Sequence, residues 1–149
     1  MKRAVDTNVL IYTHMPSLPS YERVRRYVIT QLGDPNVTLI VTLLVLHEFV
    51  HVVTDPRRFD PPLTMSEALA TARLYLGRSN VMCIGADEAV AVDAFNLLEQ
   101  FQLDRKRIAD TLLVATLARH EVRELITCNP TDFEVFDELT IVDPRKHIN

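Results

Sequence analysis

The sequence predicts an α/β protein in which helices cover both faces of a mainly parallel sheet. Short apolar segments rich in Val, Ile and Leu alternate with longer segments that carry helix start and stop signals. The short segments are continuously apolar, a pattern typical of strands buried on both faces. The chain has only three glycines, which excludes the glycine-rich phosphate loops of nucleotide-binding α/β folds.

Each expected strand is a short apolar run bounded by polar or turn residues. The second of them, VTLIV at 37–41, follows the turn sequence Gly33-Asp34-Pro35-Asn36. The expected strands are residues 2–5, 37–41, 81–84, 124–128 and 139–143. Parallel strands place their carboxyl ends at one edge of a sheet, and ligands bind beyond that edge.

The expected helices are recognised by their caps and their stops. Ser20 and Thr42 are placed to cap helices over 21–32 and 43–53, and Asp55-Pro56 ends the second of these. Three further helices are expected over residues 66–77, 87–102 and 105–120. The alternation of these helices with apolar strands is typical of a parallel sheet covered on both faces.

Length and composition indicate a single domain over residues 1–149, and the use of cysteine indicates a cytoplasmic protein. The net charge of −4 argues against nucleic-acid binding through overall positive charge, so any such contact must be local. Cys83 and Cys128 lie in apolar segments and are expected to be reduced and buried. The start of the chain lacks the apolar core of a signal peptide, and the most apolar run is too short to cross a bilayer, so no membrane contact is expected.

Three carboxylates occupy apolar surroundings, where an ionised group needs compensation. Asp6 follows the first strand, Glu48 is the only acid in 37–53, and Asp110 is the only charge in 108–118. Each alone has an ordinary explanation as a helix cap, an ion-pair partner or a first-turn acid. The expected topology, however, brings all three toward one edge of the sheet. Carboxylates held close together repel one another unless a divalent cation neutralises them, and oxygen ligands select Mg²⁺ or Mn²⁺.

A fourth polar group follows the strand at 124–128, where Asn129 and Asp132 lie in TCNPTDF; either alone is typical of a turn. A carboxylate-held Mg²⁺ with open positions can activate water and stabilise the leaving oxygen of a phosphodiester. Basic residues near the acids are suited to hold phosphates, although a solvated surface is the alternative. These basic residues are Arg57, Arg58, Arg105, Lys106 and Arg107.

In their order and spacing, the acidic motifs resemble those of the PIN-domain ribonucleases, specifically the VapC-type toxins of bacterial type II toxin-antitoxin systems. The matching stretches are VDTNVLIY, LHEFVHVVTDPRRFDPPLT, KRIADTLLVATLARH and LITCNPTDFEVF. The resemblance implies a three-layer α/β/α sandwich and an Mg²⁺- or Mn²⁺-dependent endoribonuclease acting on RNA. It also implies a homodimer and a co-expressed antitoxin. The catalytic and metal-binding quartet it implies is Asp6, Glu48, Asp110 and Asp132.

The resemblance also assigns supporting roles and shows one departure. Thr7 or Asn8 would orient Asp6 or a metal-bound water. Many relatives carry an acid where this chain has Asn129. An asparagine carbonyl can bind a hard cation but adds no charge. The departure therefore puts in question the affinity for metal, particularly for a second ion.

The pentapeptide HEFVH at 47–51 matches the HExxH pattern of zinc metalloproteases. His47 and His51 are four residues apart and share a helix face, as zinc ligands would. The residues that follow lack the glycine and third histidine of the metzincin pattern. Glu67 is another possible third ligand, although a dipole-favoured glutamate in a first helical turn explains it more simply. A zinc metalloprotease therefore stays as an alternative, beside a PIN-like domain that binds RNA or a partner without cleaving.

Overall fold

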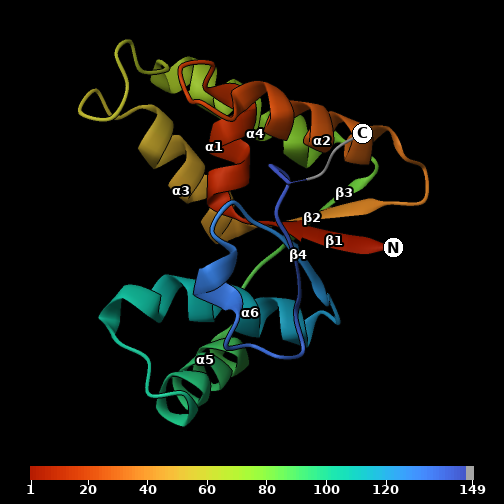
Figure 1. Ribbon diagram of the computed structural model, residues 1–149, viewed down its shortest axis with the longest axis vertical. Helices are drawn as coiled ribbons and strands as arrows, with labels where there is room; N and C mark the ends of the chain where they lie inside the picture. The colour runs from red at the N-terminus through yellow and green to blue at the C-terminus, as the bar shows by residue number, and fades with distance from the viewer. Residues whose placement is uncertain (147–149) are drawn as a thin grey trace.

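The computed structural model describes residues 1–146 and contains a five-stranded sheet in which every neighbouring pair of strands is parallel (Figure 1). The strands lie in the order β3-β2-β1-β4-β5. They are β1 (Lys2–Val5), β2 (Thr38–Thr42), β3 (Val81–Ile84), β4 (Glu124–Ile126) and β5 (Thr140–Val142). The predicted parallel sheet is confirmed, and residues 147–149 of the predicted domain lie outside the described residues.

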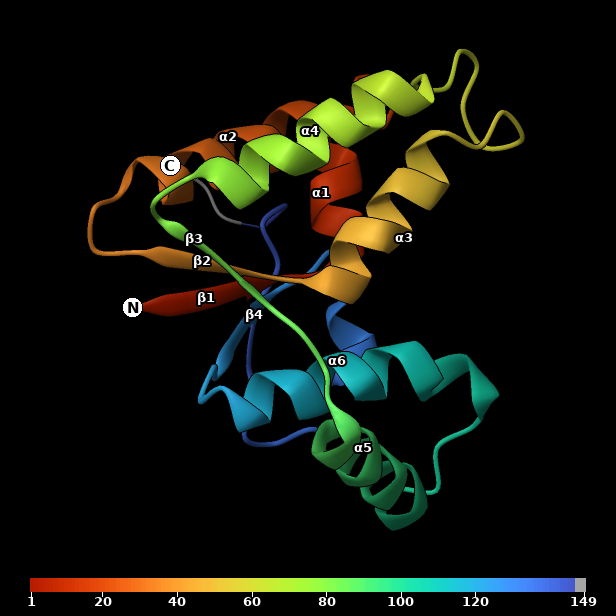
Figure 2. The same ribbon diagram turned by 180° about the vertical axis from the view of Figure 1, so that it is seen from behind.

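Helices cover both faces of this sheet, so the predicted three-layer α/β/α arrangement is also confirmed (Figures 1 and 2). One layer contains α1 (Thr7–His14), α2 (Tyr21–Gly33), α3 (Leu43–Val53) and α4 (Met65–Gly77). The other contains α5 (Glu88–Gln100) and α6 (Ile108–Arg119). Two short 3-10 helices, η1 (Arg105–Arg107) and η2 (Pro130–Phe133), lie before α6 and after β4.

Most helix starts follow the side-chain chemistry of their caps, with two differences from the sequence prediction. Thr42 caps α3 as expected, because its hydroxyl accepts a hydrogen bond from the Val45 backbone N–H at 3.1 Å. Ser20 precedes α2 but makes no side-chain cap hydrogen bond. Helix α4 begins one residue before the expected Ser66, because Thr64 and Glu67 form a reciprocal capping box around its start.

The core is built from apolar side chains on both faces of the three central strands. Val5, Ile40 and Leu125 are fully buried, one from each of β1, β2 and β4. Phe49 of α3 and Phe133 of η2 are the largest fully buried side chains, and each anchors an element that also carries a predicted acid. Full burial of such a side chain stabilises the fold by roughly 1.5–3 kcal/mol. The acids therefore project from firmly packed elements.

The two cysteines are free, and they differ in burial. Cys128 is buried and Cys83 is half-buried, so full burial was correctly predicted only for Cys128. Within residues 1–146, none of the helices has the length and apolar character needed to cross a membrane.

The chain changes its direction of travel across the sheet at β1, and in parallel α/β folds such a point borders a crevice beyond the strand ends. From β1 the chain passes to β2 and β3 on one side, and it later returns to β4 and β5 on the other. Val5 of β1 pairs with Ile126 of β4, and the Asp6 backbone N–H donates to the Ile126 carbonyl at 3.0 Å. In parallel α/β folds, ligands bind beyond the strand ends at such a topological switch point.

Acid is expected to destabilise the protein through His14, which links α1 to α4. His14 Nε2 lies 2.7 Å from the Tyr75 hydroxyl, and burial, assisted by the positive charge of Arg25, lowers the pKa of His14 to about 4. Because the unfolded chain takes up this proton more readily, stability is complete above about pH 6.5 and falls as the pH drops toward 4. Urea titrations at pH 7 and pH 4.5 should show an acid loss about 2 kcal/mol smaller in His14→Gln than in the native chain. Equal losses would contradict this role.

Candidate active site

Four carboxylates from four separate segments meet at the crevice. Asp6 is the N-cap of α1, Glu48 lies in the middle of α3, Asp110 is in the first turn of α6, and Asp132 belongs to η2. Burial, followed by repulsion from Asp6 and Asp132, raises the pKa of Asp110 to about 6. The pKa of Asp6 is likewise raised, by burial first and then by the charges of Glu48 and Asp132. The sequence-predicted quartet is thus brought together: the charges of the other three acids act on Asp110, and those of Glu48 and Asp132 act on Asp6.

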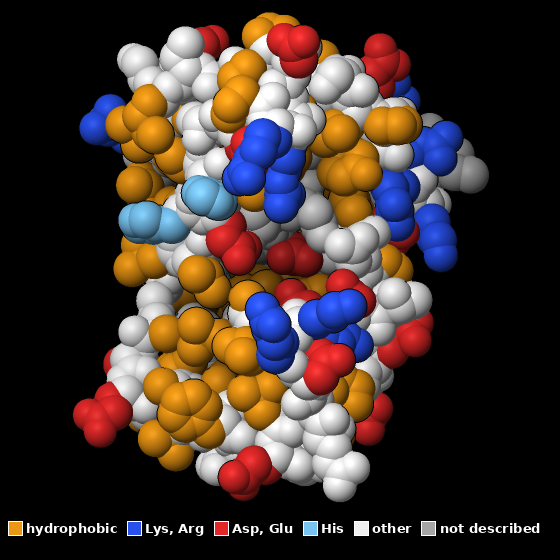
Figure 3. All heavy atoms as spheres, turned by 90° about the vertical axis from the view of Figure 1, so that its left-hand side faces the viewer, with side chains coloured by type: hydrophobic (Ala, Val, Ile, Leu, Met, Phe, Trp, Pro, Cys, Tyr) orange, Lys and Arg blue, Asp and Glu red, His pale blue; other side chains and the backbone are white. Residues whose placement is uncertain are grey.

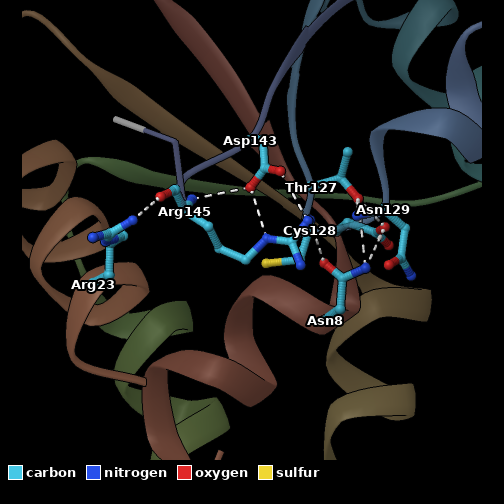
Figure 4. Close-up of polar contacts among 8 residues, drawn as sticks. Asn8, Arg23, Thr127, Cys128, Asn129, Asp143 and Arg145 are labelled. Atoms are coloured by element: carbon cyan, nitrogen blue, oxygen red, sulfur yellow. Dashed lines mark hydrogen bonds and ion pairs between the residues drawn. The ribbon is translucent and has the colours of Figure 1, made fainter. Parts of the chain in front are cut away.

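A hydrogen-bond network holds the Asp6 carboxylate in one orientation. Figure 4 labels four residues around it, Asn8, Thr127, Cys128 and Asn129. Asp6 Oδ1 accepts from the Thr7 backbone N–H at 2.8 Å, and Asp6 Oδ2 accepts from the Thr127 hydroxyl at 2.8 Å and from Asn8 Nδ2 at 3.2 Å. The Asn8 side-chain carbonyl in turn accepts from the Cys128 backbone N–H at 3.0 Å. These bonds join the ends of β1 and β4, and they fix Asp6 before any ligand arrives.

Two threonines in this network, Thr7 and Thr127, have roles that are only partly visible in the sequence. The resemblance implies that Thr7 or Asn8 orients Asp6 or a metal-bound water; both donate to Asp6, and the Thr7 hydroxyl also donates a hydrogen bond to Glu48 Oε2. Thr127 was not singled out at all. Its hydroxyl donates to Asp6 and accepts from the Asn129 backbone N–H at 3.0 Å. The available signal was its position, since Thr127 is the first residue after β4, as Asp6 is the first after β1.

The predicted basic residues divide into one that reaches the acids and four that do not. Arg107 Nη1 donates to the Asp132 backbone carbonyl and lies 3.4 Å from Asp132 Oδ1 and 3.9 Å from Asp110 Oδ2. The other four are exposed: Arg57 and Arg58 form ion pairs with Asp55, and Arg105 and Lys106 belong to η1. Figure 3 shows acidic side chains near the centre of one face, with Lys and Arg side chains above and below them.

The HExxH residues do not form the zinc site that the pattern suggested. His47 and His51 are exposed, and His47 Nδ1 lies 2.9 Å from the Leu43 carbonyl. Glu48 accepts its hydrogen bond from Thr7, and Glu67 takes part in the capping box of α4. Among residues 1–146, no group of three or more His, Cys, Asp and Glu side chains is arranged to hold a metal ion. The pattern is therefore a coincidence of helix composition.

The same finding limits what kind of cation the four acids suit. As they stand, these acids do not enclose an ion as the closed ligand sets of structural zinc sites do. Mg²⁺ behaves differently, because it keeps several of its waters and is usually bound by only one or two carboxylates together with substrate phosphates. The donors available are all oxygens, and the pKa values of Asp6 and Asp110 are raised first by burial and then by repulsion from the neighbouring acids, which a divalent ion relieves. The residues present fit a hard divalent cation in an open site.

Fold and site together define a class: a parallel α/β protein whose acidic crevice, at the switch point of its sheet, is suited to a hard divalent cation. Comparison with known families gives the class its name. The sequence model of the PIN domain matches residues 3–139, and the chain belongs to the PIN-domain family. The resemblance noted in the sequence is confirmed.

Individual relatives agree with this assignment. Ribonuclease VapC24 of Mycobacterium tuberculosis is 26% identical over 141 residues, which cover 95% of each chain. The solved structure of VapBC-1 from nontypeable Haemophilus influenzae is similar, with a TM-score of 0.67 and 18% identity over 98% of this chain and 100% of that one. Mycobacterium tuberculosis VapC20, described as a sarcin-ricin loop cleaving toxin, gives a TM-score of 0.64 and 14% identity over 83% and 86% of the two chains. At these identities, the solved structures establish the fold.

Proposed function

We propose that this chain is a divalent-metal-dependent endoribonuclease and the toxin of a toxin-antitoxin pair. The observation that carries the proposal is the meeting of four carboxylates at the switch point of a PIN-domain sheet. The curated relative VapC24 is named a ribonuclease, which supports RNA as the substrate. The proposed metal-binding and catalytic residues are Asp6, Glu48, Asp110 and Asp132, with Asn129 as a neutral metal ligand.

Mg²⁺ or Mn²⁺ bound there would lower the pKa of a coordinated water and stabilise the leaving oxygen of the phosphodiester. Hydrogen bonds from neighbouring side chains orient the carboxylates that would hold the ion. Thr127 and Thr7 hold Asp6, and Thr7 also holds Glu48, so these two carboxylates are fixed relative to each other. Asp110, on the opposite helical layer, supplies a third negative group, and the repulsion from Asp6 and Asp132 that, after burial, raises its pKa is relieved by a nearby cation.

The basic residues around the crevice are proposed to hold the RNA backbone. The chain's net charge of −4 gives no general attraction for nucleic acid, so binding depends on local clusters. Arg105 and Lys106 precede α6, while Arg57 and Arg58 follow α3, and these two helices carry Asp110 and Glu48. Exposed arginines and lysines of this kind bind phosphates without reading the bases.

The remaining parts of the proposal concern assembly. A cognate antitoxin is supported by similar solved structures that are themselves toxin-antitoxin complexes, one of them from Klebsiella pneumoniae. We propose a homodimer built from single domains spanning 1–149. Large apolar side chains remain exposed for such contacts, among them Leu74 on α4 and Phe95 on α5. The free thiols of Cys83 and Cys128 agree with a reducing, cytoplasmic setting. Light scattering of the purified chain tests the dimer.

The decisive experiment compares two neighbouring residues of α3. Glu48→Gln is expected to abolish Mn²⁺-dependent cleavage of a labelled single-stranded RNA, because the substitution removes one of the four charges. His51→Gln is expected to leave the rate within about threefold, because His51 is exposed and its loss changes none of the hydrogen bonds to Asp6 or Glu48. Comparable losses in both variants would point to a histidine-bound metal and would overturn the proposed ligand set.

A further inference from the structure

The side chain of Arg107 lies between two of the acids, and the backbone of Arg107 is held in place by hydrogen bonds. Arg107 ends η1 and precedes α6; its backbone N–H donates to the Asp104 carbonyl at 3.0 Å, and its carbonyl accepts from the Thr111 hydroxyl at 2.7 Å. The Nη1 atom of the Arg107 guanidinium lies 3.4 Å from Asp132 Oδ1 and 3.9 Å from Asp110 Oδ2. One cation therefore bridges acids that come from α6 and from η2.

Position makes this arginine different from its basic neighbours. Asp110 follows Arg107 by three residues on a helical turn, a spacing that places two side chains side by side. The Arg107 side chain is only 27% exposed, whereas Arg105 and Lys106 are exposed. Burial and the charges of the other acids raise the pKa of Asp110, and the positive charge of Arg107 opposes part of that rise. Arg107 thus supplies part of the neutralisation that the acidic site requires.

A divalent ion bound by the same carboxylates must share them with this guanidinium. Two positive groups within a few ångströms of each other repel strongly in a partly buried site, so binding of the ion and retention of both arginine contacts oppose each other. The bond from Arg107 to the Asp132 backbone carbonyl does not involve a metal-binding oxygen. The guanidinium can keep that bond while it leaves the carboxylates.

We propose that Arg107 is a built-in counter-cation of the acidic site: it bridges Asp110 and Asp132, competes with the divalent ion for them, and is displaced from them when the ion binds. The inference rests on the proposed metal-dependent function and adds a control on metal affinity. It also gives the displaced guanidinium a use, because substrate phosphates approach the same ion and arginine binds phosphate in a bidentate manner.

The test is a calorimetric titration of Mn²⁺ into chelator-treated protein, using the native chain and three variants. R107Q is expected to bind Mn²⁺ on the order of tenfold more tightly, because a nearby positive charge has been removed. R107K keeps the charge and should stay within about threefold of the native affinity. K106Q removes the same charge from an exposed neighbour and should also stay close to native, because solvent and salt screen it. The rise in melting temperature with Mn²⁺ should saturate at the lowest concentration in R107Q.

Each of the contrary results is informative. Unchanged or weaker Mn²⁺ binding by R107Q, beside clear binding by the native chain, would overturn the counter-cation role and leave the proposed nuclease intact. Equal tightening in K106Q and R107Q would overturn it too, because net charge rather than the bridge would then set the affinity. Absence of Mn²⁺ binding in all four proteins would overturn this inference together with the metal dependence of the proposed function.

Discussion

Asp110→Asn is expected to lower RNA cleavage by at least about 1,000-fold while making the metal-free protein more stable. The loss of activity follows from removing a proposed metal ligand. The gain in stability follows from the raised pKa of Asp110, about 6, because an ionised carboxylate at this position is disfavoured by burial and by Asp6 and Asp132. At pH 7.5 the full penalty is present, and it disappears as the pH falls from 6 toward the ordinary value of 3.8.

The size of that gain is limited by solvent. The Asp110 side chain is 27% exposed, so screening reduces the effect to about 1–2 kcal/mol, or a few degrees in melting temperature for a chain of this length. Chemical denaturation in the presence of EDTA measures it. Asp137→Asn is the matched control, because it removes an equal charge from an exposed position. A variant at position 110 that loses activity and also loses stability would show that Asp110 is held by favourable contacts instead of repelled.

Thr127→Val is expected to reduce cleavage by about 10- to 100-fold, because Thr127 holds the carboxylate of one proposed metal ligand, Asp6, and the backbone of another, Asn129. Valine has nearly the same shape but cannot donate to Asp6 Oδ2 or accept from the Asn129 backbone N–H. Thr127 is fully buried, so both partners lose a bond that water does not readily replace, and unfolding free energy should fall by about 1–3 kcal/mol. Cleavage assays and urea titrations of the two chains measure these effects.

Thr127→Ser separates the hydroxyl from the rest of the side chain. Serine keeps both hydrogen bonds and loses one methyl group, so its stability should fall by about 1 kcal/mol while cleavage stays near the native rate. The opposite ranking, with valine active and serine inactive, would mean that packing rather than the bond to Asp6 supports the site. The two variants therefore distinguish a role of Thr127 in orienting the Asp6 carboxylate from a role in stability alone.

Local sequence signals were sufficient for most of the fold and for the choice of acids. Continuous apolar runs between helices identified all five strands, and the pattern fits best for the central strands, which are largely buried, whereas the edge strands β3 and β5 are partly exposed. Asp6, Glu48 and Asp110 were recognised because each is an isolated charge in an apolar segment. The apolar run after β1 was assigned no structure in advance; it forms α1, whose first turn is started by the Asp6 cap.

Contacts between distant segments were beyond the reach of those signals. Thr127 looks like any strand-end threonine until β4 pairs with β1 and places its hydroxyl on Asp6. Likewise, three adjacent basic residues at 105–107 have similar chemistry, and only the approach of η2 to α6 sets Arg107 apart from the other two. The HExxH pattern failed for the same reason, since its glutamate faces Thr7 instead of a histidine-bound ion.

By itself, the sequence determined the parallel α/β architecture and singled out three isolated carboxylates, because burial and capping are encoded by neighbouring residues. The family and the fourth carboxylate, Asp132, followed from the resemblance of its motifs to those of PIN-domain proteins. Tertiary structure alone decided which side chains orient and neutralise those carboxylates. The physical reason is distance: hydrogen bonds and ion pairs act over a few ångströms, and residues 121 positions apart, such as Asp6 and Thr127, come within that range only when the sheet has formed.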